Sequence, residues 1–101
     1  MSKKYSVNIF TRAKLDIYNI TEYWVNTLKT SPKSFLDDYE KAIIDLSEFP
    51  FAHHQPNDKS LREKGYRIFP VKNYYIFYVV IDDEVQIHRV LYNKMDFTKL
   101  F

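Results

Sequence analysis

The segment Tyr74 to Ile81, which reads YYIFYVVI, constrains the fold more than any other part of the chain. Its side chains are all aromatic or aliphatic and mostly aromatic or β-branched, which favours an extended backbone. A half-exposed strand would alternate apolar and polar residues, and this segment does not. We therefore expect residues 74–81 to form a central strand that is covered on both faces.

Two further strands are expected in the second half of the chain. Residues 66–71 predict one, in which Pro70 indicates an edge position or a bulge because proline has no N–H to donate to a ladder. Residues 84–92 predict the other. The pairs Lys72-Asn73 and Asp82-Asp83 are suited to tight turns, so the three strands are expected to form a meander.

The first half of the chain has a different period. Residues 5–10 alternate as a short strand, and Thr11 is suited to cap a helix that follows it. Apolar residues then recur every three or four positions, which predicts an amphipathic helix. These residues are Ala13, Ile17, Ile20, Trp24 and Leu28.

A second amphipathic helix follows after a short connection. Ser31 is suited to its N-cap and Pro32 to its first helical position, where a missing N–H has no cost. Pro50 ends the helix. Its apolar face consists of Phe35, Tyr39, Ala42, Leu46 and Phe49. Two such helices form an antiparallel helical hairpin.

These elements predict an α+β fold of order β-α-α-β-β-β, in which an N-terminal helical hairpin packs on an antiparallel twisted sheet. Residues 1–101 are expected to form one domain, because a chain of 101 residues has room for a single core. Residues 50–65 are a polar surface connection with a turn of helix near 60–64, and a tail that is helical or irregular occupies 96–101.

Composition excludes several classes of function. The chain has no cysteine, which removes disulfides, thiolate catalysis and cysteine-ligated zinc. Gly65 is the only glycine, which removes glycine-rich phosphate loops. The chain has no apolar run of about 18 residues, and its N-terminus is too polar for a signal peptide. We therefore expect a cytoplasmic protein that needs no cofactor and does not enter a membrane.

The histidines give weak indications of chemistry. His53 and His54 are adjacent in a loop, so their side chains point in different directions, and no further ligand stands at metal-binding spacing beside them. No metal site is expected. His88 lies within a predicted strand, either as a half-buried packing group or as a catalytic base.

Positive charge is concentrated in the second part of the chain. Residues 1–58 hold seven Lys/Arg and eight Asp/Glu, a net charge of −1, whereas residues 59–101 hold eight and five, a net charge of +3. The strand residues Arg67 and Arg89 either converge with Lys72 and Lys94 on a phosphate or pair locally, Arg67 with Glu63 and Arg89 with Asp96.

The first helix carries a second apolar stripe, formed by Leu15, Tyr18 and Val25, beside its main apolar face. A helix that covers one side of a sheet needs only one such face. The stripe therefore packs on another helix or on a molecule outside the chain. The chain has nine Tyr, eight Phe and one Trp, which favours a partner for part of this ring surface.

Residues 61–96, LREKGYRIFPVKNYYIFYVVIDDEVQIHRVLYNKMD, resemble the RelE/ParE superfamily of bacterial type II toxin–antitoxin toxins. They are similar to its pattern of a glycine and hydrophobic strand, an aromatic Y-x-I/L-x-Y strand, an acidic turn and an hRVLh strand with a basic and aspartate tail. Residues 12–50 fit by architecture. The resemblance implies the family fold and a cognate antitoxin as partner in a hetero-oligomer.

The superfamily has two mechanistic branches. RelE-like members are ribosome-dependent endoribonucleases that cut mRNA, and ParE-like members poison DNA gyrase without a hydrolytic site. On the RelE-like pattern one basic position falls on Arg67, but the remaining positions fall on Phe69, Tyr75, Met95 and Phe101. Phenylalanine and methionine cannot stabilise a dianionic transition state. The resemblance is therefore nearer the ParE-like branch and implies gyrase inhibition without hydrolysis.

The resemblance also implies which residues contact each partner. The target is expected to bind Arg62, Lys64, Arg67, Lys72, Arg89 and Lys94, and the antitoxin Leu15, Tyr18, Trp24, Val25 and Leu28. Under the RelE-like alternative, in which the partners are the ribosome and mRNA, the catalytic residues are Arg67, His88, Arg89 and Lys94. A third alternative is a binding module without toxicity.

Overall fold

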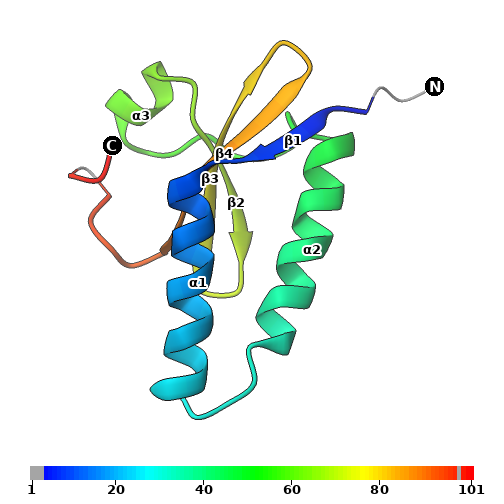
Figure 1. The fold of residues 1–101 in the computed structure, drawn as a ribbon. Coiled ribbons are helices and arrows are strands. Elements are labelled where there is room, and N and C mark those ends of the chain that lie inside the picture. The colour runs from blue at the N-terminus through cyan, green and yellow to red at the C-terminus, as the bar shows by residue number, and fades with distance from the viewer. Residues whose placement is uncertain (1–3, 98) are drawn as a thin grey trace.

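The computed structural model describes residues 4–97 and 99–101. The chain runs through seven elements, in the expected order with one short extra helix (Figure 1). They are β1 (Ser6–Ile9), α1 (Thr11–Asn26), α2 (Lys33–Glu48), α3 (Lys59–Glu63), β2 (Arg67–Val71), β3 (Tyr74–Ile81) and β4 (Glu84–Tyr92). The α+β class, the helical hairpin, the meander and the turn of helix near residues 60–64 are confirmed.

The sheet is mixed, in the order β1-β4-β3-β2. β2, β3 and β4 pair antiparallel, but β1 pairs parallel with β4, so the expectation of a wholly antiparallel sheet was wrong. The chain leaves β1 through three helices and re-enters the sheet at β2 on the far edge, and the meander then brings β4 back beside β1. Sequence patterns specify strands but not this closing pair, which is separated by most of the chain.

The strand β3 is covered on both faces, as its composition predicts. One face packs against the helices through a core that includes Phe35, Leu46, Ile76, Tyr78 and Ile87. The opposite face, here called the far face, has a smaller core of Leu61, Phe77 and Leu91, which Tyr66, Phe97 and Phe101 cover. Pro70 lies in β2, the expected edge strand.

A bulge in the β3–β4 ladder changes which side chains face the helices. Phe77 is opposite Arg89 and Tyr78 is opposite Ile87, so His88 has no partner in the register. Ile87 therefore packs against the helices, and so does Val90, three residues further on. Bulges of this kind redirect a side chain and bend the strand. This bulge determines the positions of His88 and Arg89.

The helix starts differ slightly from expectation. Phe10, not Thr11, holds the N-cap position of α1, and no side chain caps this end. Pro32 is the N-cap of α2, so this helix begins at Lys33, one residue later than expected. Ser31 nevertheless helps to start α2, because its Oγ accepts a hydrogen bond from the Lys33 N–H at 3.2 Å. These shifts leave the hydrophobic faces of both helices unchanged.

The C-terminal tail packs on the far face of the sheet. In its described part the Leu100 N–H donates to the Phe97 carbonyl at 3.0 Å, which forms a turn, and Phe97 and Phe101 contact the Phe77 ring. Thr98 lies outside the described residues. No helix within the described ranges is long and apolar enough to span a bilayer.

Candidate functional site

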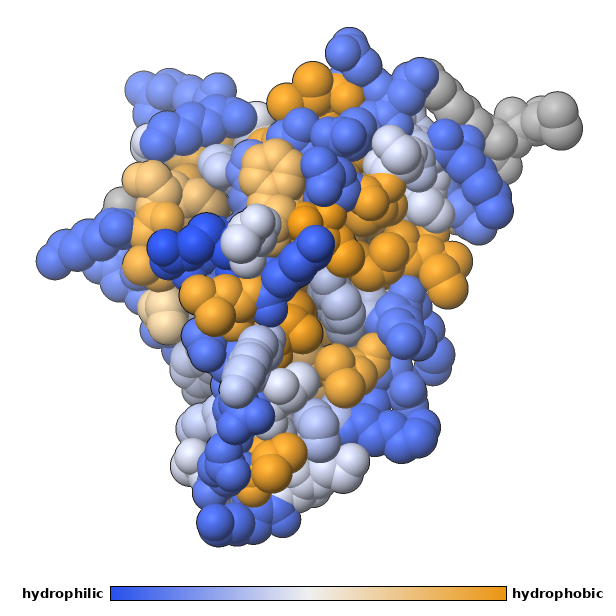
Figure 2. All heavy atoms as spheres, in the orientation of Figure 1, coloured by the Kyte–Doolittle hydropathy of each residue, from blue (hydrophilic) through white to orange (hydrophobic). Residues whose placement is uncertain are grey.

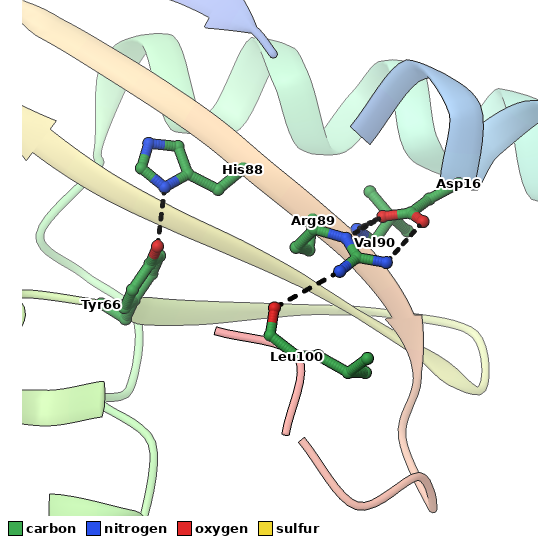
Figure 3. A network of polar contacts seen from close by, with 6 residues as sticks. All are labelled: Asp16, Tyr66, His88, Arg89, Val90 and Leu100. Atoms are coloured by element: carbon green, nitrogen blue, oxygen red, sulfur yellow. Dashed lines mark hydrogen bonds and ion pairs between the residues drawn. The ribbon is translucent and has the colours of Figure 1, made fainter. Parts of the chain in front are cut away.

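A buried ion pair joins α1 to β4. Arg89 Nε donates to Asp16 Oδ2 at 2.8 Å and Nη2 donates to Oδ1 at 3.0 Å, so the contact is bidentate (Figure 3). Hydrogen bonding to Asp16 is the main cause that raises the pKa of Arg89 above its usual value. The side chains of Arg89 and Asp16 are only 12% and 10% exposed. Arg89 is therefore a neutralised charge in this fold.

Asp16 also completes the edge of the sheet. β1 ends opposite Ile87, so β4 continues beyond its parallel neighbour with an unpaired outer edge. The Val90 N–H on this stretch donates to Asp16 Oδ2 at 3.0 Å. A buried N–H without an acceptor is destabilising by about 1–3 kcal/mol. Asp16 thus satisfies both the guanidinium and the strand edge.

A second polar chain lies beside the bulge. Tyr66 Oη and His88 Nδ1 are 2.8 Å apart, His88 Nε2 and Gln86 Oε1 are 3.1 Å apart, and Gln86 Nε2 donates to Glu84 Oε1 at 2.7 Å. The Glu84 carboxylate can only accept, so the Gln86 carbonyl accepts from His88 Nε2 and Nδ1 accepts from the Tyr66 hydroxyl. The four residues therefore form a chain with a single direction of donation.

Burial keeps this chain neutral at His88 and Tyr66. Burial lowers the pKa of His88 and raises the pKa of Tyr66, so each shift favours the uncharged form. The His88 ring also stacks on Phe10, with ring centroids 4.4 Å apart. The geometry suits a fixed binding surface better than proton transfer, because the His88 ring nitrogens already have partners.

Two hollows flank the Asp16–Arg89 pair. The first, here called the basic cavity, has a volume of about 730 Å³ and opens where β1 passes into α1. Arg89 and Leu100 line it together with both rings of the polar chain. Its other lining residues are Asn8, Ile9, Phe10, Thr11, Arg12, Lys14 and Phe101.

The second hollow, here called the apolar groove, runs between α1 and the last residues of β4. Its volume is also about 730 Å³. Arg89 and Leu100 line it as well, at the end that meets the basic cavity. Its apolar lining includes Ile20, Tyr23, Trp24, Leu28, Tyr74, Tyr92 and Met95.

The residues expected to bind an antitoxin divide into two groups. Trp24 and Leu28 line the apolar groove, and Trp24 Nε1 donates to the Tyr74 hydroxyl at 3.0 Å. The stripe residues Leu15, Tyr18 and Val25 are 50%, 53% and 49% exposed but do not line the groove. Figure 2 shows apolar patches separated by hydrophilic side chains on the face that carries both helices.

The basic residues expected at a target site do not gather in one place. Arg67 is held by the carbonyls of His53 and Phe51, at 2.9 and 3.4 Å, on the helix-facing side of the sheet, because it is opposite Tyr78. Tyr66, which holds His88, packs on the far face. Arg67 and His88 are therefore not brought together.

The other expected cations are dispersed as well. Arg62 donates to the carbonyls of Pro56 and Asn57 within the loop before α3. Lys72 pairs with Asp38 at 3.0 Å. Lys64 and Lys94 are exposed, at the end of α3 and in the turn after β4. Arg89 pairs with Asp16 and Arg67 with main-chain carbonyls, instead of the local partners Asp96 and Glu63 considered from the sequence.

Sequence reasoning missed Asp16 and Tyr66, and of the cations that line the basic cavity it missed Arg12 and Lys14. A signal for Asp16 was present, since it lies three residues after Ala13 and four before Ile20 on the buried face of α1. A carboxylate on such a face predicts a buried partner. Tyr66 gives no comparable signal, because the bulge that places His88 beside it is not visible in the sequence.

The histidine loop packs against β2 and α2 through His53. Within residues 4–97 and 99–101, no group of three or more His, Cys, Asp or Glu side chains is placed to hold a metal ion. The His53 ring packs on Phe69 with centroids 4.3 Å apart, and its Nε2 lies 3.6 Å from Asp45 Oδ2.

Both the sequence and the fold are similar to those of known proteins. Residues 7–97 match the sequence family described as ParE toxin of type II toxin–antitoxin system, parDE. The fold is similar to the chromosomal ParDE system from P. aeruginosa, with TM-score 0.71 and 18% identity over 90% of this chain and 98% of that chain. It is also similar to the RelBE2 toxin–antitoxin complex from Mycobacterium tuberculosis, with TM-score 0.64 and 25% identity over 88% and 98%.

A comparison with curated protein sequences gives no match. The family match, however, spans nearly the whole domain and includes every helix and strand except the first residue of β1. The chain belongs to the ParE toxin family of type II toxin–antitoxin systems, within the RelE/ParE superfamily.

Proposed function

We propose that this family member inhibits DNA gyrase through protein contact, and that a cognate antitoxin neutralises it by occupying the apolar groove. The proposal of an antitoxin partner rests on the groove itself, a hollow of about 730 Å³ with exposed aromatic and aliphatic walls. The observation that favours protein contact over RNA cleavage is the engagement of Arg67 and Arg89 in the fold.

The groove suits an antitoxin segment for two reasons. Tyr23, Trp24 and Leu28 offer the apolar anchors that a helix in a groove requires. Beyond Ile87 the outer edge of β4 has no neighbouring strand among the described residues, so an extended segment can also add to the sheet. The similar structures described as ParDE and RelBE2 systems support an antitoxin partner in general terms.

The stripe of Leu15, Tyr18 and Val25 is proposed as a secondary contact. These residues lie around α1 from the groove, so a segment that wraps the helix would cover both. Aromatic anchors at the centre of an interface contribute most of its binding free energy, and peripheral contacts contribute less. The groove is therefore the main determinant of affinity.

The proposal of gyrase, and not RNA, as the target rests on electrostatics. Cleavage of RNA without a metal requires cationic side chains free to stabilise a dianionic transition state. Arg89 is neutralised by Asp16, and Arg67 is bound to main-chain carbonyls. Gyrase contact needs only a complementary surface, to which the exposed Lys64 and Lys94 would contribute.

The antitoxin proposal is tested with a matched pair of variants, Tyr23→Glu and Tyr18→Glu. Both tyrosines are exposed on α1, at 48% and 53%, but only Tyr23 lines the groove. We expect Tyr23→Glu to weaken binding of the protein encoded by the adjacent reading frame on the order of 100-fold, and Tyr18→Glu about tenfold. Equal affinities for wild type and Tyr23→Glu, at unchanged melting temperature, would remove the groove from the interface.

The target proposal is tested with purified components. The free protein should block supercoiling by gyrase and should leave a translated message uncut in a primer-extension assay. Discrete cuts in the message would replace gyrase inhibition with the RelE-like activity. Normal growth of cells that express the protein without its antitoxin would contradict toxicity altogether.

A further inference from the structure

The helix α2 has an outward face that points away from the sheet. Its core-facing residues Phe35, Ala42 and Leu46 are buried, and the helical period places Ile44 on the opposite side. Ile44 is 61% exposed, more than any other large apolar side chain among the described residues. Figure 1 shows α2 at the margin of the molecule, with α1 and the sheet to one side of it. A single exposed isoleucine needs no partner, so the charges around it decide whether this face is a binding surface.

Two charges of opposite sign flank Ile44 along the helix. Lys41 lies three residues before it and Glu48 four residues after it. Seven residues make almost two full turns, so both side chains lie on the same side of the outward face, roughly 10 Å apart along the axis. Within residues 4–97 and 99–101, neither forms an ion pair. The face therefore carries a cation and an anion that the fold does not use.

This pattern is complementary to itself about a two-fold axis. When two copies of α2 pack antiparallel with Ile44 against Ile44, a residue before Ile44 comes opposite the residue at the same distance after it in the other copy. Lys41 of each copy then faces Glu48 of the other, which gives two pairs in one contact. Both residues lie on the same side of the face, so the two side chains of each pair meet directly.

The remaining charges on the outward face are compatible with this packing. Lys33 and Asp37 neutralise each other within one copy, with 2.7 Å between Nζ and Oδ2. Glu40 lies on the other side of the face and comes opposite Ser47 of the second copy. Ser47 is uncharged, and its hydroxyl donates to a carbonyl of its own helix at 2.6 Å. The packing therefore places no two like charges directly opposite each other.

We propose that the outward face of α2 is a dimerisation surface, on which a second copy of this chain packs antiparallel through Ile44 and two Lys41–Glu48 pairs. Helix axes that are about 8–10 Å apart bring side chains at these positions into contact. A single helix pair buries less than the roughly 1,200–2,000 Å² of a stable interface, so the dimer is weak and forms at high concentration. The alternation of charge about a central isoleucine favours a second copy, because it matches its own reverse.

The dimerisation surface is separate from both hollows. No residue of α2 lines the apolar groove or the basic cavity. Two chains joined through α2 therefore keep both grooves open, and each can still bind an antitoxin. The proposal is independent of gyrase inhibition, and the experiments below measure the dimer without either partner.

Sedimentation equilibrium of the full chain tests the dimer directly. Between about 10 µM and about 1 mM protein, the average mass should rise from 12.3 kDa toward twice that value. Over the same range the amide NMR signals of Lys41, Ile44 and Glu48 should shift, whereas those of the exposed α1 residue Tyr18 should not. A mass that stays at 12.3 kDa at the highest concentration would overturn the proposal.

Charge reversal distinguishes this dimer from any other. Lys41→Glu and Glu48→Lys each place like charges opposite one another in both pairs, and each should raise the dissociation constant of the dimer at least about tenfold. Lys41→Glu/Glu48→Lys restores both pairs with reversed polarity and should return the constant to within about threefold of the wild-type value. Circular dichroism checks that the variants remain folded. A folded double variant that does not recover dimerisation would contradict the pairing.

Two matched controls lie outside α2. Lys64→Glu makes the same change of charge as Lys41→Glu at another exposed lysine, and Ile81→Ser makes the same change as Ile44→Ser at an isoleucine that is 51% exposed. Ile44→Ser should weaken the dimer about tenfold, and both controls should change its dissociation constant less than about twofold. Equal effects of either control and its α2 counterpart would remove α2 from the interface.

Addition of the protein encoded by the adjacent reading frame examines a different occupant of this face. The amide signals of Ile44 and Lys41 should keep their concentration dependence when the apolar groove is occupied, because the two surfaces are separate. A chain that is monomeric alone, and whose Ile44 and Lys41 signals shift only when that protein is added, would assign the face to the antitoxin and overturn the dimer.

Discussion

The basic cavity and the apolar groove have the same volume, about 730 Å³ each, and share Arg89 and Leu100, yet their chemistry is opposite. The basic cavity combines the cations at the start of α1 with polar aromatic residues. The groove combines the later turns of the same helix with apolar side chains of β4 and its neighbours. One helix thus lines two unlike hollows because successive turns carry different residues past one strand.

The Asp16–Arg89 pair, here called the shared wall, explains how the two hollows stay separate. Arg89 lines both hollows and is neutralised by Asp16, which lines only the groove, so the positive charge of the basic cavity does not extend into the groove. An unpaired arginine at this position would place a buried charge beside apolar walls, which is strongly unfavourable. Electrostatic neutrality at one contact therefore allows a charged site and an apolar site to be neighbours.

The largest predicted effect comes from breaking this wall. Asp16→Ala leaves the Arg89 guanidinium and the Val90 N–H without their acceptor in a buried position. We expect a loss of about 3–5 kcal/mol in the free energy of unfolding, measured by urea denaturation. Asp37→Ala is the matched control, because the exposed Lys33–Asp37 pair has its N and O atoms only 2.7 Å apart. It should leave the free energy of unfolding nearly unchanged, because solvent screens an exposed pair. Similar losses in both variants would contradict a structural role for the wall.

A smaller effect is expected at the glycine that sets the position of Tyr66 in the basic cavity. Gly65 has φ +87° and ends α3, where the Tyr66 N–H donates to the Leu61 carbonyl at 3.1 Å. A Cβ there meets no atom within 4 Å, so only backbone strain opposes Gly65→Ala. We expect a loss of about 1 kcal/mol in unfolding free energy. An unchanged midpoint in urea would show that this conformation is not required.

The pH dependence of stability should distinguish the two hollows, because only the basic cavity has a histidine in its wall. Burial lowers the pKa of His88 from 6.5, so the unfolded chain binds this proton at a higher pH than the folded chain. The stabilisation is complete above pH 6.5 and declines as the pH falls toward the folded pKa. His88→Gln should flatten the fall in melting temperature below this pH, whereas His54→Gln, at an exposed loop position, should not. A steeper fall in His88→Gln would contradict this assignment.

The smallest effect is expected near the groove end of α1. Lys29 has φ 56° in the connection between the two helices, a conformation that is unfavourable for a residue with a Cβ. Lys29→Gly should raise the unfolding free energy by a few tenths of a kcal/mol, since relief of strain exceeds the added freedom of the unfolded chain. Differential scanning calorimetry beside Gly65→Ala should show shifts of opposite sign. A lower melting temperature in Lys29→Gly would indicate that the connection is not strained.

Local sequence patterns predict most of the fold. The apolar run of β3, the helical periods and the proline boundaries specify elements within a residue or two of their observed bounds. The parallel pairing of β1 with β4 was not predictable in this way, because the two strands share no local signal. The starts of both helices moved by one residue because Phe10 and Pro32 hold the N-cap positions.

The candidate sites were less predictable than the fold. The apolar stripe and Trp24 are visible in the sequence because exposed aromatic residues exceed what one helix face needs. The basic cavity depends on the bulge opposite Phe77 and Tyr78, which brings His88 beside Tyr66. It also depends on Asp16, whose partner Arg89 lies 73 residues later in the chain. Such pairings are set by tertiary packing and leave little trace in local composition.

The parallel contact between β1 and β4 has a consequence for synthesis of the protein. The hydrogen-bonding partner of Ser6–Ile9 is Glu84–Ile87, so a nascent chain cannot close its sheet until that later strand has left the ribosome. Prematurely terminated products would lack the strand on which both β1 and β3 depend. For a toxin, this order of assembly means that chains truncated before β4 are expected to be inert.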